Sequence, residues 1–324
     1  MSSSGGSPPV VGSFSHGFPE HIRIVSQEHS LPFSKGILSE SLTATGLPPQ
    51  RAYAVAQLVE GSLRRRESLE IALDDLRSLV MASLAENEEP LFVDRYQKWQ
   101  ELTASNRPLI IVIGGATGVG KSTLASQVAA RLGIVRLIST DTIRQVMRAF
   151  FSSTLMPSIH CSSFDAEKAV RVPLDKTADP RVLGFVEQVR MVNAGVEAVV
   201  TRAVKEGLRM VVEGVHIVPG FMPSLADSPA LIMQLIVAVT DEASHRSHFL
   251  LRERQTEGRR PNRRYVRHFH DIRRIQEFIL ALAGEQGTLV VENEDIDSAV
   301  GTVVDALYAR LGETGTGASI AAAC

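Results

Sequence analysis

Residues 109–123 read Leu-Ile-Ile-Val-Ile-Gly-Gly-Ala-Thr-Gly-Val-Gly-Lys-Ser-Thr, an apolar run followed by a glycine-rich turn. Residues 115–122 fit the phosphate-binding pattern G-x-x-x-x-G-K-[ST] at every constrained position. Glycines let such a loop wrap closely enough for its N–H groups to face phosphate oxygens. The lysine then reaches the β- and γ-phosphates, and the hydroxyl ligates Mg²⁺. The stretch therefore predicts a strand, a loop and a helix around a nucleoside triphosphate.

The predicted nucleotide-binding residues extend from the first glycine of the loop into the helix behind it. They are Gly115, Ala116, Thr117, Gly118, Val119, Gly120, Lys121, Ser122 and Thr123. The run 124–132 is predicted to be helical, and its positive N-terminal end adds to an anion site. Lys121 is the predicted catalytic cation on the transferring phosphates, and Ser122 is a predicted ligand of Mg²⁺.

The composition of the chain indicates a globular protein. Its 324 residues suffice for two domains, 44% of them are hydrophobic, and the net charge of −2 gives no general attraction to nucleic acid or membrane. The two cysteines, Cys161 and Cys324, offer neither a disulfide framework nor zinc-ligand spacing. No apolar run reaches the roughly 18 residues of a membrane span. We therefore expect a cytoplasmic protein with no nucleic-acid or membrane partner, whose oligomeric state the sequence leaves open.

Four parts of the chain differ in their sequence patterns. Residues 1–20 are expected to be disordered and residues 312–324 to form a flexible tail. Residues 21–106 are expected to form a small, mostly helical domain. Residues 107–311 alternate helical stretches with strand candidates at 109–113, 134–138, 209–213, 231–239 and 287–291. This alternation predicts an α/β fold in which helices flank a parallel five-stranded sheet.

Ligands of an open α/β sheet bind at the carboxyl ends of its strands, and the strand predicted at 134–138 is followed by suitable side chains. Asp141 could accept the proton of an acceptor hydroxyl or ligate Mg²⁺ through water; the alternative is a helix N-cap. Arg144 and Arg148 share a helical face and could bind an anionic substrate, the alternative being a solvated pair.

A second strand end, that of 209–213, carries Glu213, Gly214 and, two residues on, His216. A carboxylate that ends an apolar strand beside a phosphate loop is placed to hold Mg²⁺ or to polarise water, so Glu213 is a predicted metal ligand. His216 is a candidate substrate contact, and a structural hydrogen-bonding group is the alternative.

Residues 244–274 contain ten arginines, and Gly258, Pro261 and Asn262 interrupt the helical pattern midway. Two helices joined by an arginine-bearing turn suit a lid that closes over transferring phosphates. A solvated helical hairpin and an RNA-binding patch are the alternatives. The aromatic residues of the segment occupy core-like positions, which disfavours the RNA-binding patch. Arg246 is a candidate for binding the acceptor, and Arg252 and Arg254 are candidates for catalysis.

The stretches 108–148, 159–166 and 212–216 resemble the 2-phosphoglycerate kinase family, and the resemblance covers most of residues 22–310. It implies a P-loop kinase fold, ATP and Mg²⁺, and transfer of the γ-phosphoryl group to the free hydroxyl of 2-phosphoglycerate. It also implies that His160, Ser162 and Ser163 are substrate contacts. Residues 22–104 resemble an ATP-cone module, with Lys35, Leu58-Val59-Glu60 and residues 96–99 in the expected order and an atypical opening turn at residues 26–30.

The function expected from these patterns is in-line phosphoryl transfer from ATP to a small phosphorylated acceptor. Asp141 would orient or deprotonate the acceptor hydroxyl, and the arginines would bind its anionic groups. The alternatives are a P-loop kinase for another phosphorylated acid or polyol, such as an inositol phosphate, and a regulator that senses a nucleotide.

Overall fold

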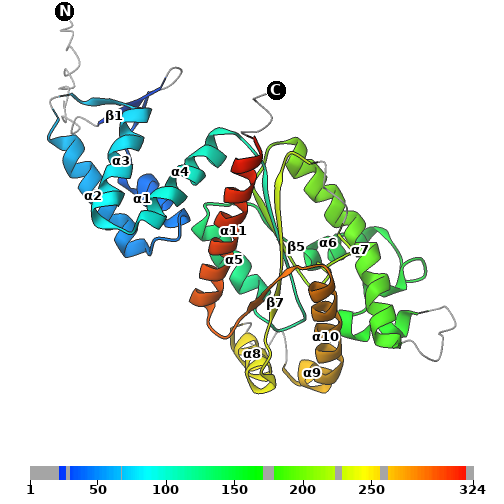
Figure 1. Cartoon of the computed structure of the whole chain (residues 1–324). Coiled ribbons are helices and arrows are strands. Elements are labelled where there is room, and N and C mark those ends of the chain that lie inside the picture. The colour runs from blue at the N-terminus through cyan, green and yellow to red at the C-terminus, as the bar shows by residue number, and fades with distance from the viewer. Residues whose placement is uncertain are drawn as a thin grey trace, which may run out of the picture.

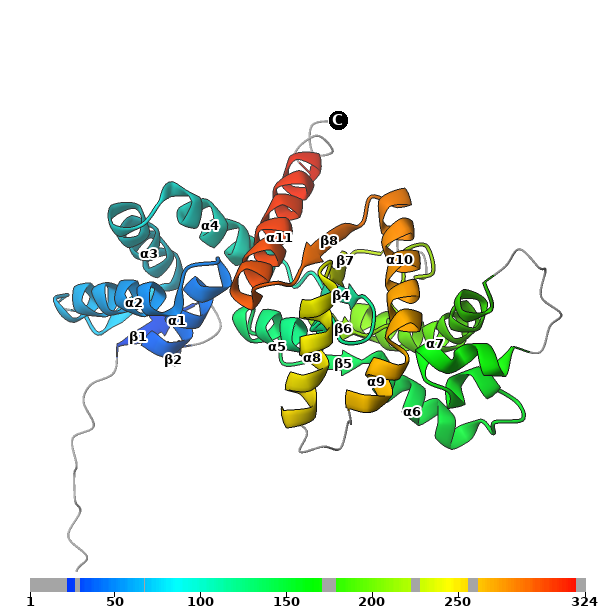
Figure 2. The same cartoon turned by 90° about the horizontal axis from the view of Figure 1, so that it is seen from below.

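The computed structural model describes residues 22–26, 30–66, 68–170, 179–222, 228–255 and 262–318. Its central feature is a five-stranded sheet (Figure 1) in the order β5-β6-β4-β7-β8, in which every neighbouring pair is parallel and which Figure 2 labels strand by strand. The strands are β4 (Leu109–Gly114), β5 (Leu137–Ser139), β6 (Met210–Glu213), β7 (Leu231–Ala238) and β8 (Leu289–Glu292). The predicted α/β fold with five parallel strands is confirmed. Strand β4, which leads into the phosphate-binding loop, is the central strand of the sheet.

Helices cover both faces of this sheet, which makes three layers (Figure 2). Along β4, Ile111 and Ile113 belong to the same core cluster as residues of α5 and α11, whereas Ile110 and Val112 pack with residues of α7. A strand whose successive side chains are buried on opposite faces reads as a continuous apolar run, which is how 109–113 reads. The helices of this region are α5 (Lys121–Arg131), α6 (Thr140–Phe150), α7 (Pro180–Lys205), α8 (Glu242–Gln255), α9 (Asn262–Arg267), α10 (Phe269–Glu285) and α11 (Ile296–Ala318). Two 3₁₀ segments, η1 (Pro157–His160) and η2 (Ser163–Ala169), lie between α6 and α7.

The N-terminal residues form a separate group of elements that leads into β4 through its last helix (Figure 1). It contains β1 (Arg23–Val25), β2 (Ser30–Pro32), β3 (Glu70–Ala72), α1 (Lys35–Ala44), α2 (Pro49–Arg64), α3 (Leu73–Asn87) and α4 (Pro90–Ala104). It is attached to α11, because Arg95 pairs with Asp305 at 2.7 Å and the Tyr308 hydroxyl donates to Ala44 O at 3.0 Å. Lys35 and Glu60, which carry part of the ATP-cone resemblance, form an ion pair at 3.0 Å.

The edge strand β5 and the C-terminal tail differ from the sequence expectations. The edge strand β5 begins at Leu137 rather than at 134, because its paired register with β6 begins with Leu137 opposite Val211. Helix α11 continues to Ala318, so the tail predicted from residue 312 is helical over 312–318, and 319–324 lie outside the described residues. The segment 1–20, predicted to be disordered, also lies outside them. Within the described parts of the chain, no helix is both long enough and apolar enough to span a bilayer.

Candidate active site

The phosphate-binding motif forms the loop between β4 and α5 at the carboxyl end of the central strand. Gly115, Gly118 and Gly120 have φ values of 133°, 91° and 88°. Residues with a Cβ rarely adopt this region, so the glycines of the motif serve the conformation of the loop itself. Because α5 begins at Lys121, the N–H groups of its first turn and its positive end are directed at the same place.

Lys121 lies within the loop, and its Nζ donates to Ala116 O at 2.6 Å. Burial is the main effect on its ammonium and lowers the pKa, while the charges of Glu213 and Asp141 act in the opposite direction. The ammonium group of Lys121 is therefore held at the phosphate loop, where the motif places it.

Two of the residues predicted to ligate Mg²⁺ meet where α5 begins beside the end of β6. The Ser122 hydroxyl donates to Glu213 Oε1 at 3.0 Å, and Glu213 is buried at the last position of β6. Among the described residues, no cluster of three or more His, Cys, Asp or Glu side chains could hold a metal by itself. A hydroxyl and carboxylates that leave most positions to water and phosphate fit Mg²⁺, which retains much of its water shell. The donor set therefore fits the ion expected with a nucleotide.

Asp141 lies in the first turn of α6, and it is not the N-cap. The cap is Ser139, whose hydroxyl accepts from Thr142 N at 3.0 Å. The Asp141 side chain is 59% exposed and pairs with Arg144 at 3.3 Å. Since capping belongs to another residue, the alternative structural role considered for Asp141 is wrong, and its carboxylate is available to a ligand.

Arg144 and Arg148 differ in what they bind. Arg144 Nη1 donates to Ile159 O at 3.1 Å and to Cys161 O at 2.7 Å, so this guanidinium holds the η1 segment in place. Arg148 is bound only through Gln145 Oε1, at 3.2 Å, among the contacts within the described part of the chain. Arg144 therefore uses its guanidinium to bind backbone carbonyls, whereas the guanidinium of Arg148 makes no hydrogen bond to the backbone among the described residues.

A cavity of about 440 Å³ opens where α6, the two 3₁₀ segments and α9 meet. Its lining carries more cations than anions. The lining residues are Arg144, Arg148, His160, Cys161, Ser162, Asp165, Lys168 and Arg264. Asp165, the one carboxylate in the lining, is already paired with Lys168 at 2.7 Å, and nearby cations lower its pKa although burial opposes them. The remaining positive charge suits a small anionic ligand.

Of the three residues implied only by resemblance, two line this cavity. His160 Nε2 donates to Phe151 O at 2.8 Å, and Ser162 Oγ accepts from Arg264 Nη2 at 2.7 Å. Ser163 is buried and is not part of the cavity lining.

His216 is completely buried and does not line the cavity. Gln188 Nε2 donates to the carbonyls of Ser158 and Cys161, so its Oε1 is left to accept from His216 Nε2 at 3.1 Å. His216 Nδ1 in turn accepts from the Thr140 hydroxyl at 2.7 Å. Burial lowers the pKa of His216 to about 3, which keeps the ring neutral in this arrangement. The contacts of His216 are those of a structural hydrogen-bonding group, the alternative role named above. Hydrogen bonds from Thr140 through His216 and Gln188 link the start of α6 to Cys161 in the cavity wall.

The arginine-rich segment divides between α8, α9 and α10, with residues 256–261 outside the described residues. The Arg246 guanidinium lies 4.1 Å from the centre of the Phe269 ring and pairs with Glu242, outside the cavity lining. Arg254 is exposed, and the side chain of Arg252 lies outside the described ones. The aromatic residues of the segment pack in the core cluster, as expected, with Phe249 and Phe269 buried.

Four lining residues were absent from the sequence-based set of site residues: Cys161, Asp165, Lys168 and Arg264. Arg264 is one of ten arginines in its segment, so its position in the sequence does not distinguish it. Asp165 and Lys168 follow a polar stretch three residues apart, a spacing that equally suits a surface ion pair. Only their position at the cavity separates them from other charged residues.

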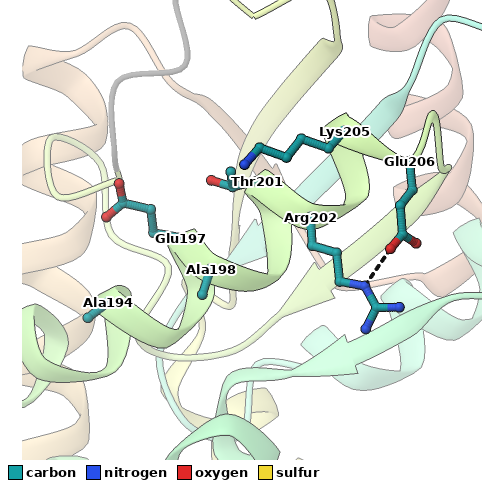
Figure 3. Close-up of a pocket in the computed structure, with 7 residues that line it drawn as sticks. All are labelled: Ala194, Glu197, Ala198, Thr201, Arg202, Lys205 and Glu206. Carbon is teal, nitrogen blue, oxygen red and sulfur yellow. Dashed lines mark hydrogen bonds and ion pairs between the residues drawn. The ribbon is translucent and has the colours of Figure 1, made fainter.

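Another cavity, of about 560 Å³, lies elsewhere (Figure 3). Ala194, Glu197, Ala198, Thr201, Arg202, Lys205 and Glu206 line it, and all belong to α7 or to its C-cap. This end of α7 precedes β6, so it lies toward the amino ends of the parallel strands. Ligands of such sheets bind at the opposite edge, which favours the smaller cavity.

A parallel sheet with this loop at its central strand and a cationic cavity on the same edge defines a P-loop phosphotransferase. Consistent with this class, residues 93–169 match the Zeta toxin family. Longer matches come from proteins named 2-phosphoglycerate kinase. The protein of Methanopyrus kandleri is 38% identical over 290 residues, covering 90% of this chain and 88% of its own.

The proteins of Methanothermobacter thermautotrophicus and Thermococcus kodakarensis, with the same name, are each 39% identical over 88% of this chain, and the alignments cover 92% and 96% of their own lengths. The chain belongs to the 2-phosphoglycerate kinase family, which confirms the resemblance found in its sequence.

Proposed function

We propose that this protein transfers the γ-phosphoryl group of ATP to the free hydroxyl of 2-phosphoglycerate, giving 2,3-bisphosphoglycerate and ADP. The observation that carries the proposal is the cationic cavity, which suits an acceptor bearing both a phosphate and a carboxylate. Arg144 joins it to the phosphate loop, because this residue lines the cavity and pairs with Asp141, whose charge acts on Lys121.

The nucleotide side of the site consists of the loop and α5. Loop N–H groups and Lys121 bind the β- and γ-phosphates and neutralise charge that develops during transfer. Ser122 and Glu213 would hold Mg²⁺, with Asp141 as a further ligand through water; the ion supplies charge neutralisation on the phosphates when bound.

The acceptor side uses residues that the fold brings together from α6, η1, η2 and α9. Arg148, Lys168 and Arg264 bind the phosphate and carboxylate, with His160 and Ser162 as neutral partners. Asp141 orients the acceptor hydroxyl and receives its proton as the oxygen forms a bond to the γ-phosphorus and the bond to the β,γ-bridging oxygen breaks. Arg252 and Arg254, in the predicted lid segment of residues 244–274, are proposed to neutralise charge on the γ-phosphoryl group during transfer.

The remaining assignments made from the sequence extend this proposal. Residues 21–106 form a domain related to the ATP-cone module, and residues 107–311 form the kinase domain. The protein acts in the cytoplasm, where its two small-molecule substrates are available.

The test is ATP turnover by the purified chain with a panel of phosphorylated acids and polyols, with the products identified by ³¹P nuclear magnetic resonance. We expect ADP to form in equal amount to 2,3-bisphosphoglycerate, and Lys121→Ala to abolish turnover because the charge on the β- and γ-phosphates is lost. Turnover with another member of the panel and none with 2-phosphoglycerate would refute the proposed acceptor. Nucleotide binding with no turnover at all would favour the regulator.

A further inference from the structure

Four successive carbonyl groups of the phosphate loop, those of residues 116–119, each accept a hydrogen bond from a side chain. The bonds are Lys121 Nζ to Ala116 O at 2.6 Å, His245 Nε2 to Thr117 O at 2.9 Å, His248 Nδ1 to Gly118 O at 3.0 Å and Asn293 Nδ2 to Val119 O at 2.9 Å. Two of these donors, His245 and His248, lie three residues apart in α8. Neither histidine belongs to the phosphate-binding motif.

The acceptor in each histidine bond is a carbonyl oxygen, which cannot donate. The ring nitrogen that faces it must therefore carry a proton, Nε2 in His245 and Nδ1 in His248. The two rings thus present different nitrogens to two adjacent peptide groups, and each bond needs its own side-chain geometry.

The direction of these carbonyls determines the direction of the loop N–H groups. In a trans peptide the C=O of one residue and the N–H of the next point to opposite sides of the chain. Holding Thr117 O and Gly118 O against α8 therefore turns the N–H groups of Gly118 and Val119 to the other side of the loop. Successive N–H groups presented in this way form an anion-binding concavity, which is what the phosphates of a nucleotide require.

The surroundings of His245 indicate that its role is the hydrogen bond from Nε2 to the phosphate loop. The ring is fully buried, stacks on Phe249 with centroids 5.4 Å apart, and meets Phe269 edge-on. Within the described part of the chain its Nδ1 has no hydrogen-bond partner. A phenylalanine would pack in such a site without burying an unpaired acceptor, so the bond from Nε2 is what distinguishes histidine here.

Gly118 shows how closely α8 approaches the loop. Its φ is 91°, and a Cβ added there would collide with the Phe249 ring and come within 3.1 Å of His245 Nε2. The helix therefore contacts the loop through both its aromatic face and its two histidines.

We propose that α8 is a clamp on the phosphate loop, in which His245 and His248 are positioning residues that aim the N–H groups of Gly118 and Val119 at the nucleotide phosphates. The inference rests on the proposed function to the extent that it takes ATP as the ligand of this loop. In this proposal α8, the first helix of the predicted lid, helps to bind the nucleotide. The residue of the predicted lid that lines the acceptor cavity is Arg264, in α9.

Amide side chains provide a test of the two bonds because their length can be matched to the ring nitrogen. Glutamine can place its amide nitrogen near the position of Nε2, and asparagine near that of Nδ1. The matched variants, His245→Gln and His248→Asn, thus retain a donor at the position of the ring nitrogen. The mismatched variants, His245→Asn and His248→Gln, carry the same amide group but place its nitrogen at the wrong distance from the carbonyl. His270→Gln, at an exposed histidine of α10, is the control for loss of a histidine.

The measurement is calorimetric titration of each full-length variant with Mg·ATP, without acceptor, together with the KM for 2-phosphoglycerate and the thermal midpoint. We expect each mismatched variant to bind ATP about 3- to 10-fold more weakly, as for one lost hydrogen bond, with an unchanged acceptor KM. The matched variants and His270→Gln should stay within about twofold of wild type.

Equal ATP affinity in matched and mismatched variants of both positions would overturn the clamp, since shape alone would then account for α8. His248 is only half-buried, so its pair of variants decides the question even where the His245 variants fail to fold. Absence of ATP binding by the wild-type protein is a different result, because it refutes the proposed function and the clamp together.

Discussion

Replacement of Arg264 by alanine is the sharpest perturbation of the cavity proposed to bind the acceptor. Its Nη2 donates to Ser162 Oγ at 2.7 Å, and its guanidinium lies 3.5 Å from Asp165 Oδ2. The side chain is 56% exposed, so it retains donors for a ligand while being held in position from one side. We expect Arg264→Ala to weaken use of the acceptor and to leave ATP binding unchanged.

The magnitude follows from what is lost. A charge-assisted hydrogen bond to a bound anion contributes roughly 1.5–3 kcal/mol, which corresponds to about 10- to 150-fold in kcat/KM for the acceptor. The cost in stability is small, because Asp165 keeps Lys168 at 2.7 Å and the Arg264 side chain that is lost is 56% exposed, so its ion pair is screened by solvent and is worth ~0.2–1 kcal/mol. Arg264→Lys should recover activity only in part, since an ammonium lacks the two-pronged geometry of a guanidinium.

The assay is steady-state kinetics with varied 2-phosphoglycerate at saturating ATP, with Arg267→Ala as the matched control. Arg267 is exposed on the same short helix and is not part of the cavity lining, so its removal subtracts the same charge. Equal losses in the two variants would mean that α9 contributes only a general positive field. An Arg264→Ala enzyme with wild-type kcat/KM would refute the placement of the acceptor in this cavity.

Three further predictions concern other parts of the site. Asp141→Asn should keep the thermal midpoint near that of wild type, because Ser139 caps α6. It should lower kcat by on the order of 10² or more, as for loss of a general base. A destabilised variant with normal turnover would make Asp141 structural. Arg254→Ala should lower kcat with both KM values unchanged if this residue neutralises charge in the transition state, and unchanged kinetics would leave it a solvated arginine. The free energy of unfolding should fall as the pH drops below 6.5, because burial lowers the pKa of His216 to about 3 and the unfolded chain therefore binds the proton first. The loss from this group is ~2 kcal/mol between pH 6.5 and 4.5, to be measured by urea unfolding, and a His216→Gln variant with the same slope would contradict it.

The sequence by itself determined the nucleotide half of this protein. The phosphate loop, the five strands and the place of Glu213 at the end of its strand all follow from patterns within a few residues of one another. Local conformation dominates in each case: glycines permit the loop, continuous apolar runs form buried strands, and parallel strands bring their carboxyl ends to one edge. The family resemblance rests on the same local motifs.

The tertiary structure decided the proposed acceptor site. Ser162 and Arg264 are 102 residues apart in the sequence, and only the packing of α9 against the 3₁₀ segments brings them within 2.7 Å. Packing likewise turned His216 into the buried partner of Gln188 rather than a cavity residue, and it placed the two histidines of α8 on the phosphate loop. A single histidine or arginine has no periodicity that reveals its partner, because its role is set by whichever distant side chains and carbonyls the core places beside it.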